Sequence, residues 1–438
     1  MIEKNNPSVV RSWTFYDWAN SVYSLVIVSS VFPVYYQAVT TAADGSDKVN
    51  FFGFTLANSV LLSYAISFSY IVVTPLLPLL SGIADYAGNK KFFMGMFANL
   101  GGLACAMLYF FDATNLELGI ACVVLACIGY SGSVVFYDAY LPEIVTEDKM
   151  DSVSARGYIM GYAGSVLLLI FSLVMISNYQ TFGFADESSA VRFVFLLVGC
   201  WWILFSQIPL RVLPTSGKKL FSGGQVMWSG YVELKKVWNE LKQQNEIRRY
   251  LLSYFFFNMG VQTIMYLAAT FGSKELQLPG SKLIATVLLI QLVGALGAWS
   301  FARVSDRIGN KATLSVMISI WIVICLSAYF ITQEYQFYAV ACAVGTVMGG
   351  IQSLGRATYA KLLPADTKDF ASYFSFYDVV YNLSIVVGTF MYGFVEQVTG
   401  SMRNSTLVLM TFFIAGLYLL QKVNMQHLPS VATNTKGA

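Results

Sequence analysis

Twelve long apolar runs constrain the fold of this chain more than any other feature. A hydrocarbon core of about 30 Å requires roughly 20 apolar residues per helical span. Each run reaches that length, so the sequence predicts an all-α polytopic membrane protein with twelve transmembrane helices. The expected spans are residues 12–38, 54–83, 92–111, 117–140, 156–177, 190–210, 250–273, 283–303, 313–332, 336–358, 370–396 and 404–423.

The composition agrees with a lipid-facing exterior. Only 12% of the residues are charged and 56% are hydrophobic, whereas soluble domains carry about 25% charged residues. A formal charge of +3 gives no indication of nucleic-acid binding. The single histidine, His427, lies in the polar tail, and the six cysteines form no CxxC pair. We therefore expect no metal and no cofactor.

Loop charges predict the orientation. If the N-terminus is cytoplasmic, 22 of the 27 lysines and arginines lie on or near the cytoplasmic side. Because Lys and Arg are retained on that side during insertion, both termini are expected to be cytoplasmic, in a plasma (bacterial inner) membrane.

The longest loop divides the chain into two sets of six spans. The expected domains are a six-helix bundle over 1–210, a cytoplasmic linker over 211–249, a second bundle over 250–424 and a tail over 425–438. In the linker, apolar residues recur at helical spacing, with lysines on the other side. That pattern predicts an amphipathic helix on the anionic leaflet; a solvated charged linker is the alternative. The apolar residues are Trp228, Tyr231, Leu234, Trp238 and Leu241.

The two halves repeat each other. After the second run the chain reads Ser81-Gly-Ile-Ala-Asp85-Tyr-Ala-Gly88-Asn89-Lys90, and after the eighth it reads Ala302-Arg-Val-Ser-Asp306-Arg307-Ile-Gly309-Asn310-Lys311. The two aspartates are 221 positions apart, and Pro142 and Pro364 are 222 apart. Two motifs at nearly one offset indicate an internal duplication.

These loops resemble the G-x-L-A-D-R-x-G-R-K signature of the major facilitator superfamily. The resemblance implies two pseudo-symmetric six-helix bundles, with the loops acting as a gate that clamps the outward-open state. Ser81, Tyr86 and Asn89 depart from the signature, which implies a weaker clamp. A turn without a switching role is the alternative. The matching gating residues are Asp85, Gly88, Lys90, Asp306, Arg307, Gly309 and Lys311.

Further motifs resemble a narrower group, the autophagy-related vacuolar effluxer-like family. They are Phe15-Tyr16-Asp17-Trp18-Ala19-Asn20-Ser21, Tyr140-Leu-Pro-Glu143, Ser154-Ala-Arg156-Gly-Tyr158 and Gln352-Ser-Leu-Gly-Arg356. The match spans nearly the whole chain. Fungal members export amino acids from vacuoles, so the resemblance implies a secondary transporter with an amino acid as the favoured substrate. Arg156 and Arg356 join the expected gate.

Polar residues inside the apolar runs are candidate site residues, because ionisable groups in a bilayer are costly. Asp17 and Asn20 share one face of the first run with Tyr16 beside them, and could bind an amine or a proton. The alternative is a carboxylate that merely stabilises a helix N-terminus. We expect proton coupling at Asp17, Asp138 and Asp378.

The eleventh and seventh runs carry the rest of the expected substrate site. In the eleventh, Tyr377 and Tyr381 recur beside Asp378 and Asn382, and aromatic stripes can bind amphipathic solutes. Asp378 corresponds to Arg156 in the repeat, which suggests an ion pair; pairing of each with loop charges is the alternative. In the seventh, Asn258 and Gln262 share a face, where hydrogen bonds between helices are the alternative role.

The sequence thus predicts a monomeric secondary transporter that moves a small solute across the bilayer by alternating access. No GxxxxGK[ST] motif is present, so we expect the energy to come from a proton, another ion or the gradient of the solute itself. Protons are favoured, because Asp17, Asp138 and Asp378 are acids within the apolar runs and could titrate there. A sugar–cation symporter and a non-transporting receptor or scaffold with a transporter fold are the alternatives. An intramembrane enzyme is disfavoured, because the only histidine is in the tail.

Overall fold

The computed structural model describes residues 3–42, 46–215, 224–364, 367–399 and 401–425. The tail that contains His427 lies outside these residues. Among the described residues, eleven helices are long and apolar enough to cross a membrane. The remaining expected span, 250–273, is the seventh in chain order and lies within the helix α10.

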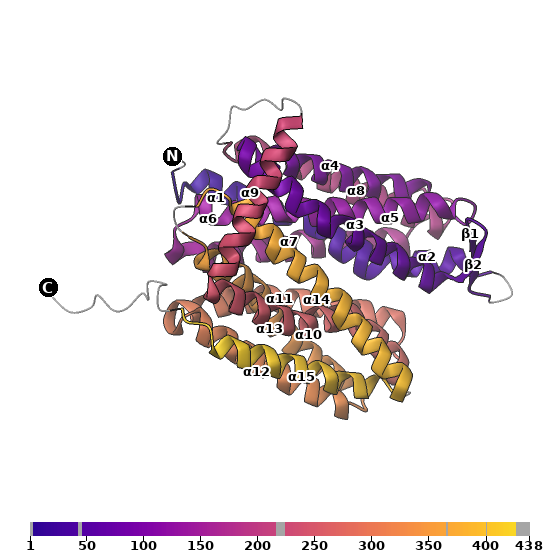
Figure 1. Ribbon diagram of the computed structural model, residues 1–438. Coiled ribbons are helices and arrows are strands. Elements are labelled where there is room, and N and C mark those ends of the chain that lie inside the picture. Colours follow the sequence, from indigo (N-terminus) through magenta and orange to yellow (C-terminus); the bar gives the residue numbers. More distant parts are fainter. Residues whose placement is uncertain (1–2, 43–45, 216–223, 365–366, 400, 426–438) are drawn as a thin grey trace. The chain divides into compact units, whose positions relative to one another are not determined.

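The elements follow the expected spans closely (Figure 1). In chain order they are α1 (Pro7–Val22), the π-helical η1 (Tyr23–Ser30), α2 (Val31–Thr40), β1 (Lys48–Phe51), β2 (Phe54–Ala57), α3 (Asn58–Ala87), α4 (Lys90–Met107), the 3-10 turn η2 (Leu108–Phe110), α5 (Leu116–Asp138), α6 (Leu141–Ile144), α7 (Glu147–Ser177), α8 (Glu187–Val212), α9 (Gly224–Gln243), α10 (Asn245–Leu276), α11 (Gly280–Ile308), α12 (Asn310–Phe330), α13 (Glu334–Leu362), α14 (Phe370–Thr399) and α15 (Met402–Gln421).

The expected second span begins four residues too early. Residues 54–57 are not helical but form β2, which pairs antiparallel with β1. Phe52 and Gly53 connect the strands with φ of 48° and 86°, the left-handed backbone of a tight hairpin turn. The turn is closed by the Gly53 amide, which donates to Asn50 Oδ1 at 3.0 Å. Apolar residues in these strands imitate the start of a helix in the sequence.

By their contacts, the residues divide into two compact units. The N-terminal unit contains 11–137 and 160–230. The C-terminal unit contains 1–10, 138–159 and 231–438. Segment 138–159 belongs to the first half of the sequence, yet it packs with helices of the second half. The domain limits expected from the repeat stay a prediction.

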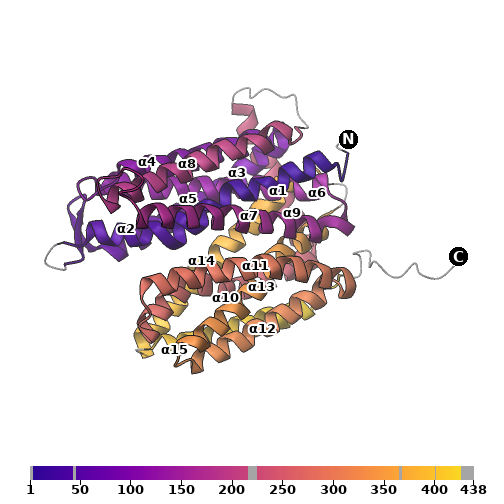
Figure 2. The ribbon, with the colours of Figure 1, turned by 180° about the vertical axis from the view of Figure 1, so that it is seen from behind.

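Within each unit, helices pack closely along one another. In the N-terminal unit α4 lies along α8, and in the C-terminal unit α11 lies along α13 and α12 along α15, as both ribbon views show (Figures 1 and 2). Glycines allow the closest approaches: a Cβ on Gly129 of α5 would lie 2.5 Å from the Gly101 Cα of α4. Such close packing of small residues is typical of helix contacts in membranes.

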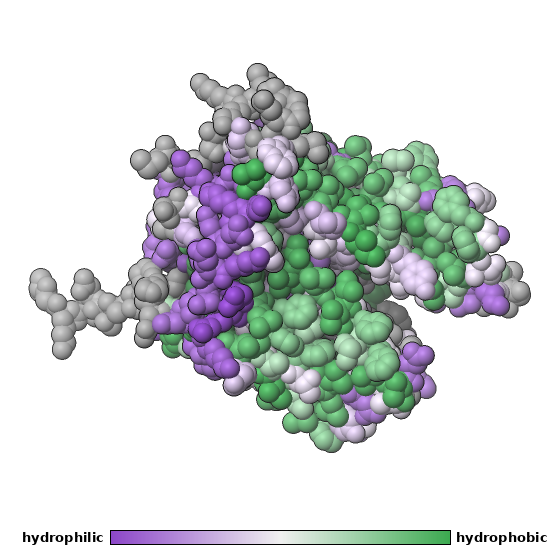
Figure 3. Space-filling view, in the orientation of Figure 1, coloured by the Kyte–Doolittle hydropathy of each residue, from purple (hydrophilic) through white to green (hydrophobic). Residues whose placement is uncertain are grey.

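The outward faces of the long helices are apolar. Large exposed side chains include Ile71 on α3, Leu204 on α8 and Phe390 on α14. The space-filling view shows hydrophobic residues over the helices and hydrophilic residues gathered over α9 (Figure 3). In water these surfaces would be unfavourable, so they indicate contact with lipid. The chain is an integral membrane protein.

Replacing Gly297 by Ala should destabilise the C-terminal unit. A Cβ at this position of α11 would collide with the Thr346 carbonyl group of α13, and overpacking of this kind costs about 1–3 kcal/mol. The midpoint of thermal unfolding in detergent measures the effect. Gly393→Ala on α14 is the matched control, because a Cβ there meets nothing within 4 Å. Equal midpoints for the two variants would contradict the packing described.

Candidate functional site

A buried arginine organises one end of the C-terminal unit. Arg356 of α13 is 3% exposed, and its Nη1 lies 2.8 Å from Asp138 Oδ1 at the end of α5. Its Nε donates to Ser154 Oγ at 3.0 Å and its Nη2 donates to the Ser154 carbonyl at 3.1 Å. The guanidinium carbon also lies 4.7 Å from the ring centroid of Tyr158. Arg356 thus binds both α5 and α7 to α13.

A second buried pair lies on the same helices. Lys361 Nζ of α13 is 2.7 Å from Asp151 Oδ2 of α7. The same carboxylate accepts hydrogen bonds from Ser305 Oγ at 2.8 Å and from Asn310 Nδ2 at 2.9 Å. Asn310 Oδ1 in turn accepts from Lys361 Nζ at 2.9 Å. We name these two sites together the α13 cluster: Asp138, Asp151, Ser154, Ser305, Asn310, Arg356 and Lys361.

Small apolar residues complete the packing around this cluster. Ala155 of α7 packs against Ala298 and Ala302 of α11, and all three are buried. The Ser154 hydroxyl donates to the Ser353 carbonyl at 2.8 Å, so α7 also lies close to the α13 backbone. The first turns of α7 are therefore held to α11 and α13 by direct contact, with charges satisfied in the interior.

The two repeated loops differ in which of their residues are buried and which contacts those residues make. After α3, Gly88 takes the left-handed conformation with φ of 64°, Asp85 is half-buried and Lys90 is buried. After α11, Gly309 has φ of 81°, while Asp306 and Arg307 are exposed. Their neighbours Ser305 and Asn310 are buried and make the contacts to Asp151. Lys311 Nζ donates to the carbonyls of Gln421 and Val423 at 2.7 and 2.8 Å, at the end of α15.

In the N-terminal unit, Asp17 lies in an aromatic environment. The Tyr137 hydroxyl donates to Asp17 Oδ2 at 2.7 Å. The Tyr137 ring stacks on Trp13 with centroids 4.4 Å apart, and Tyr16 lies 5.0 Å away. Trp13 Nε1 donates to the Tyr137 carbonyl at 2.8 Å. The sequence identified Tyr16 and Asp17 but gave no indication of Tyr137 as the partner.

Asn20, on the same face of α1, is 1% exposed. Its Oδ1 accepts from the Ser21 hydroxyl at 3.3 Å. A Cβ on Gly161 of α7 would collide with that hydroxyl and one on Gly164 would lie 2.9 Å from the Trp18 carbonyl. The glycines of α7 therefore let it cross α1 closely, beside the expected site residues.

The C-terminal unit brings the other expected site residues onto two packed helices. Asn258 Nδ2 of α10 donates to Ser384 Oγ of α14 at 2.6 Å, and Gln262 Nε2 donates to Asn258 Oδ1 at 3.2 Å. On α14, Asn382 Nδ2 donates to Asp378 Oδ2 at 3.2 Å. Asn258 and Gln262 thus take part in the helix contact that the sequence offered as their alternative role.

Tyrosines surround this region. Tyr377 stacks on Tyr254 with centroids 4.3 Å apart and on Tyr359 at 4.9 Å. Tyr377 is buried and Tyr381 is half-buried. Arg156 is exposed, whereas Asp378 is 8% exposed and bonded to Asn382. The arginine that forms a buried ion pair in this unit is Arg356, with Asp138, and not Arg156 with Asp378 as the repeat suggested.

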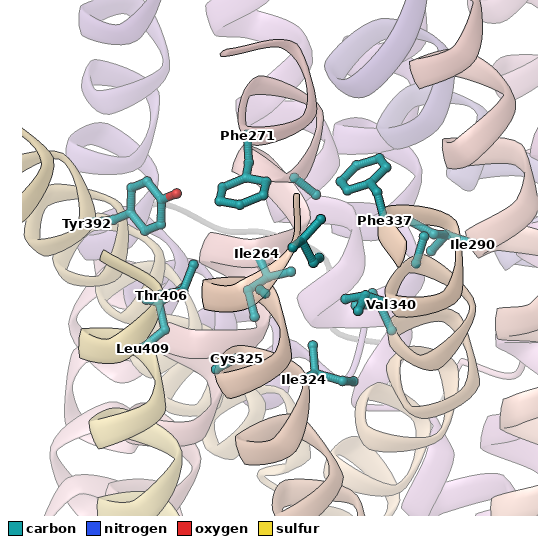
Figure 4. Close-up of a pocket in the computed structure, with 15 residues that line it drawn as sticks. Ile264, Phe271, Ile290, Ile324, Cys325, Phe337, Val340, Tyr392, Thr406 and Leu409 are labelled. Carbon is teal, nitrogen blue, oxygen red and sulfur yellow. The ribbon is translucent and has the colours of Figure 1, made fainter. Parts of the chain in front are cut away.

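A separate pocket of about 70 Å³ lies between α10, α11, α12, α13, α14 and α15 (Figure 4). Phe271, Phe337 and Ile324 are among its lining residues, and Tyr392 and Thr406 supply the polar atoms. No residue of the expected substrate site lines it. Its hydrocarbon lining offers little to orient a polar solute.

Sequence reasoning missed several members of the α13 cluster. Asp151, Lys361, Ser154 and Ser305 lie near the ends of helices, where charged and hydroxyl residues are expected in any membrane protein. In the sequence, Ser154 was noted only as part of a family motif, and Ser305 and Asn310 only as part of the repeated loop. Asp138 was expected to carry a proton, yet it is bound in an ion pair. Only the contacts between distant segments reveal the cluster.

Replacing Arg356 by Gln should destabilise the protein by about 3–5 kcal/mol, because it leaves the buried Asp138 without its counter-charge. The double variant Arg356→Gln/Asp138→Asn should recover part of the loss, since it removes both charges. Thermal unfolding in detergent reports both effects. Arg307→Gln, at an exposed position of α11, is the control and should change stability by less than about 0.5 kcal/mol. A double variant no more stable than the single one would refute direct pairing.

Tyr137→Phe removes only the hydroxyl that binds Asp17 and keeps the ring that stacks on Trp13. We expect a loss of about 1.5–3 kcal/mol, the usual contribution of a hydrogen bond to a charged group. Chemical denaturation measures it, with Tyr109→Phe on the exposed turn η2 as control. If both variants behave like the parent protein, the Tyr137–Asp17 bond has no structural role.

Comparisons with known proteins agree with this architecture. The profile of the family described as vacuole effluxer Atg22 like matches residues 5–428. The chain is 31% identical to the uncharacterized MFS-type transporter YxiO of Bacillus subtilis over 94% of this chain and 93% of that protein. It is 23% identical to autophagy-related protein 22-2 of Aspergillus oryzae over 85% of this chain and 75% of that protein.

Solved structures share the fold. The crystal structure of the transporter FucP in the outward conformation aligns with a TM-score of 0.71 at 13% identity, over 96% of this chain and 99% of that one. The human organic anion transporter MFSD10 aligns with a TM-score of 0.72 at 13% identity, over 96% of this chain and 100% of that one. The chain therefore has the major facilitator fold, functions as a transporter of that superfamily, and belongs to the vacuole effluxer Atg22-like family.

Proposed function

We propose that this transporter moves an amino acid by alternating access, coupled to protons, and that the α13 cluster is its cytoplasmic gate. The observation that carries the proposal is the set of buried charges that binds the end of α5 and the start of α7 to α13: Arg356 with Asp138, and Lys361 with Asp151. By the distribution of Lys and Arg, this end of the helices is cytoplasmic.

Such a gate suits a switch between two states. The two buried ion pairs are stable when each charge has its partner and its hydrogen bonds. Separating the charges is costly as long as water cannot reach them. Water reaching the charges offsets that cost, because each group can then be solvated in the open state. The closed and open arrangements can therefore differ by only a few kcal/mol, as alternating access requires.

Polar groups near aromatic rings support an amino acid as the substrate. An amino acid carries an ammonium group, which a buried carboxylate such as Asp17 or Asp378 can bind. Its carboxylate group can accept from amides such as those of Asn20, Asn258, Gln262 and Asn382. Tyr16, Tyr377 and Tyr381 add aromatic surface for the side chain and cation–π attraction for the ammonium group.

Proton coupling is assigned to Asp378 first and to Asp17 second. Asp378 accepts a hydrogen bond from the neutral amide of Asn382, and Asp17 accepts one from the neutral Tyr137 hydroxyl. A proton can bind either carboxylate without displacing those groups. In contrast, protonation of Asp138 would break its ion pair with Arg356. Asp138 therefore suits a role in the gate, which opens or closes according to the occupancy of the substrate site.

Counterflow into proteoliposomes tests the proposal. Vesicles preloaded with unlabelled amino acids should accumulate the labelled one, and faster under an imposed pH gradient. Exchange of sugars alone would transfer the assignment to a sugar–cation symporter. No exchange with any amino acid, sugar or nucleoside pool, from protein that unfolds cooperatively, would favour a receptor or scaffold with a transporter fold.

Asp378→Asn should abolish the effect of the pH gradient while exchange at equal pH continues, since the amide cannot bind a proton in this range. The measurement is the ratio of initial rates with and without the gradient, expected to fall to about one. Asp148→Asn, at an exposed position at the start of α7, controls for the change of charge. A gradient effect that persists in Asp378→Asn would exclude this carboxylate as the coupling site.

A further inference from the structure

Helix α9 is fixed to the C-terminal unit by one of its faces. Lys236 Nζ lies 2.7 Å from Asp369 Oδ2, just before α14, and 2.8 Å from Glu233 Oε1. Glu240 Oε2 accepts from the Tyr373 hydroxyl at 2.8 Å. Val237 and Leu241, on the same face, are buried. These contacts hold α9 against the beginning of α14.

Lys236 is the cation of this attachment, and both of its partners are carboxylates. The hydrogen bonds to Asp369 and Glu233 raise the pKa of Lys236 above its usual value, so this lysine stays charged at any physiological pH. Lys236 is therefore committed to protein contacts. The other lysines of α9, Lys235 and Lys242, lie on its opposite face.

The opposite face of α9 combines aromatic and basic residues. Tyr231, Val232 and Trp238 are 47%, 49% and 47% exposed, and Lys235 and Lys242 are exposed among them. Lys242 Nζ lies 5.1 Å from the Trp238 ring centroid. The sequence predicted one apolar stripe that includes Leu241. Leu241 is instead buried with Val237, and it is the aromatic residues that share the exposed face with lysines.

This exposed face continues into the lipid-facing surface of α14. The Trp238 ring lies 5.4 Å from that of Phe376 in the second turn of α14. Exposed apolar residues then follow at helical spacing along α14: Leu383, Val387, Phe390 and Phe394. Trp238 thus lies where the apolar surface of a membrane-spanning helix begins, which is the level of the lipid headgroups.

We propose that the exposed face of α9 binds anionic phospholipid headgroups, with Lys235 and Lys242 paired to phosphates and Trp238 inserted at the boundary of the acyl chains. Lysines flanking an interfacial tryptophan fit an anionic headgroup above hydrocarbon, because the ammonium groups extend to the phosphates while the aliphatic stems and the ring contact apolar surface. The positive charge of this face selects anionic over zwitterionic lipid. The proposal is independent of the transported solute.

Native mass spectrometry of the full-length detergent-solubilised protein tests it. Phosphatidylglycerol and phosphatidylcholine are titrated separately, and the affinity of the first bound lipid is compared. Phosphatidylglycerol should bind more tightly, and Lys235→Gln/Lys242→Gln should weaken it by about 10–30-fold, since each lysine near a surface contributes roughly five-fold. Binding of phosphatidylcholine should not change.

Three comparisons make the result specific. Lys149→Gln removes an exposed charge from α7 and should retain the affinity for phosphatidylglycerol. Lys235→Arg/Lys242→Arg keeps both charges and should also retain it. Raising the salt from about 0.1 M to about 0.5 M should weaken phosphatidylglycerol binding to the parent protein, through screening. Equal affinities for the two lipids, or an unchanged affinity in the double Gln variant, would overturn the proposal.

Discussion

The burial of the Arg356 guanidinium is the interaction on which the C-terminal unit depends. An arginine in a low-dielectric interior must have its charge and donors satisfied. Arg356 obtains both from the end of α5 and the second turn of α7, through Asp138 and Ser154. Because no part of α13 itself supplies these groups, the unit is complete only with segment 138–159 in contact. The contacts of Lys361 with Asp151 reinforce the same requirement.

That requirement links stability to transport. The carboxylates that pair with Arg356 and Lys361 come from the first half of the sequence, while both cations belong to the second half. A movement that separates the end of α5 and the start of α7 from α13 must therefore part both ion pairs, which is acceptable only if water reaches the four charges. Small residues line the contact between α7 and α11, so the two helices can pack closely and separate again without large side chains in the way. They are Ala155, Ala298 and Ala302.

The sequence predicted the membrane fold well because hydrocarbon thickness dictates span length, and a run of apolar residues is a local property. It failed at residues 54–57, where an apolar hairpin imitates a helix start. The candidate site was partly predictable: the polar face of Asp17 and Asn20 follows from helical spacing within one segment. Its partner Tyr137 lies 120 residues away, and contacts over such separations leave no periodic signal.

The gate illustrates the same limit. Arg356 and Asp138 could each be selected as charged residues in apolar runs, yet their pairing was not evident, and the repeat instead suggested Arg156 with Asp378. Internal symmetry relates backbone positions but does not conserve side-chain roles. At the repeated loops, accordingly, the exposed Asp306 and Arg307 match the motif while the neighbouring Ser305 and Asn310 make the buried contacts.

Cross-linking the start of α7 to α11 tests the central claim, that this contact must open during transport. Ala155→Cys and Ala302→Cys, introduced together into a cysteine-free background that transports, bring two thiols into a contact already made by buried alanines. Oxidation should abolish counterflow of the exchanged solute, and reduction should restore it, while oxidised single variants keep their activity. Full counterflow from protein with the cross-link in place would contradict the account.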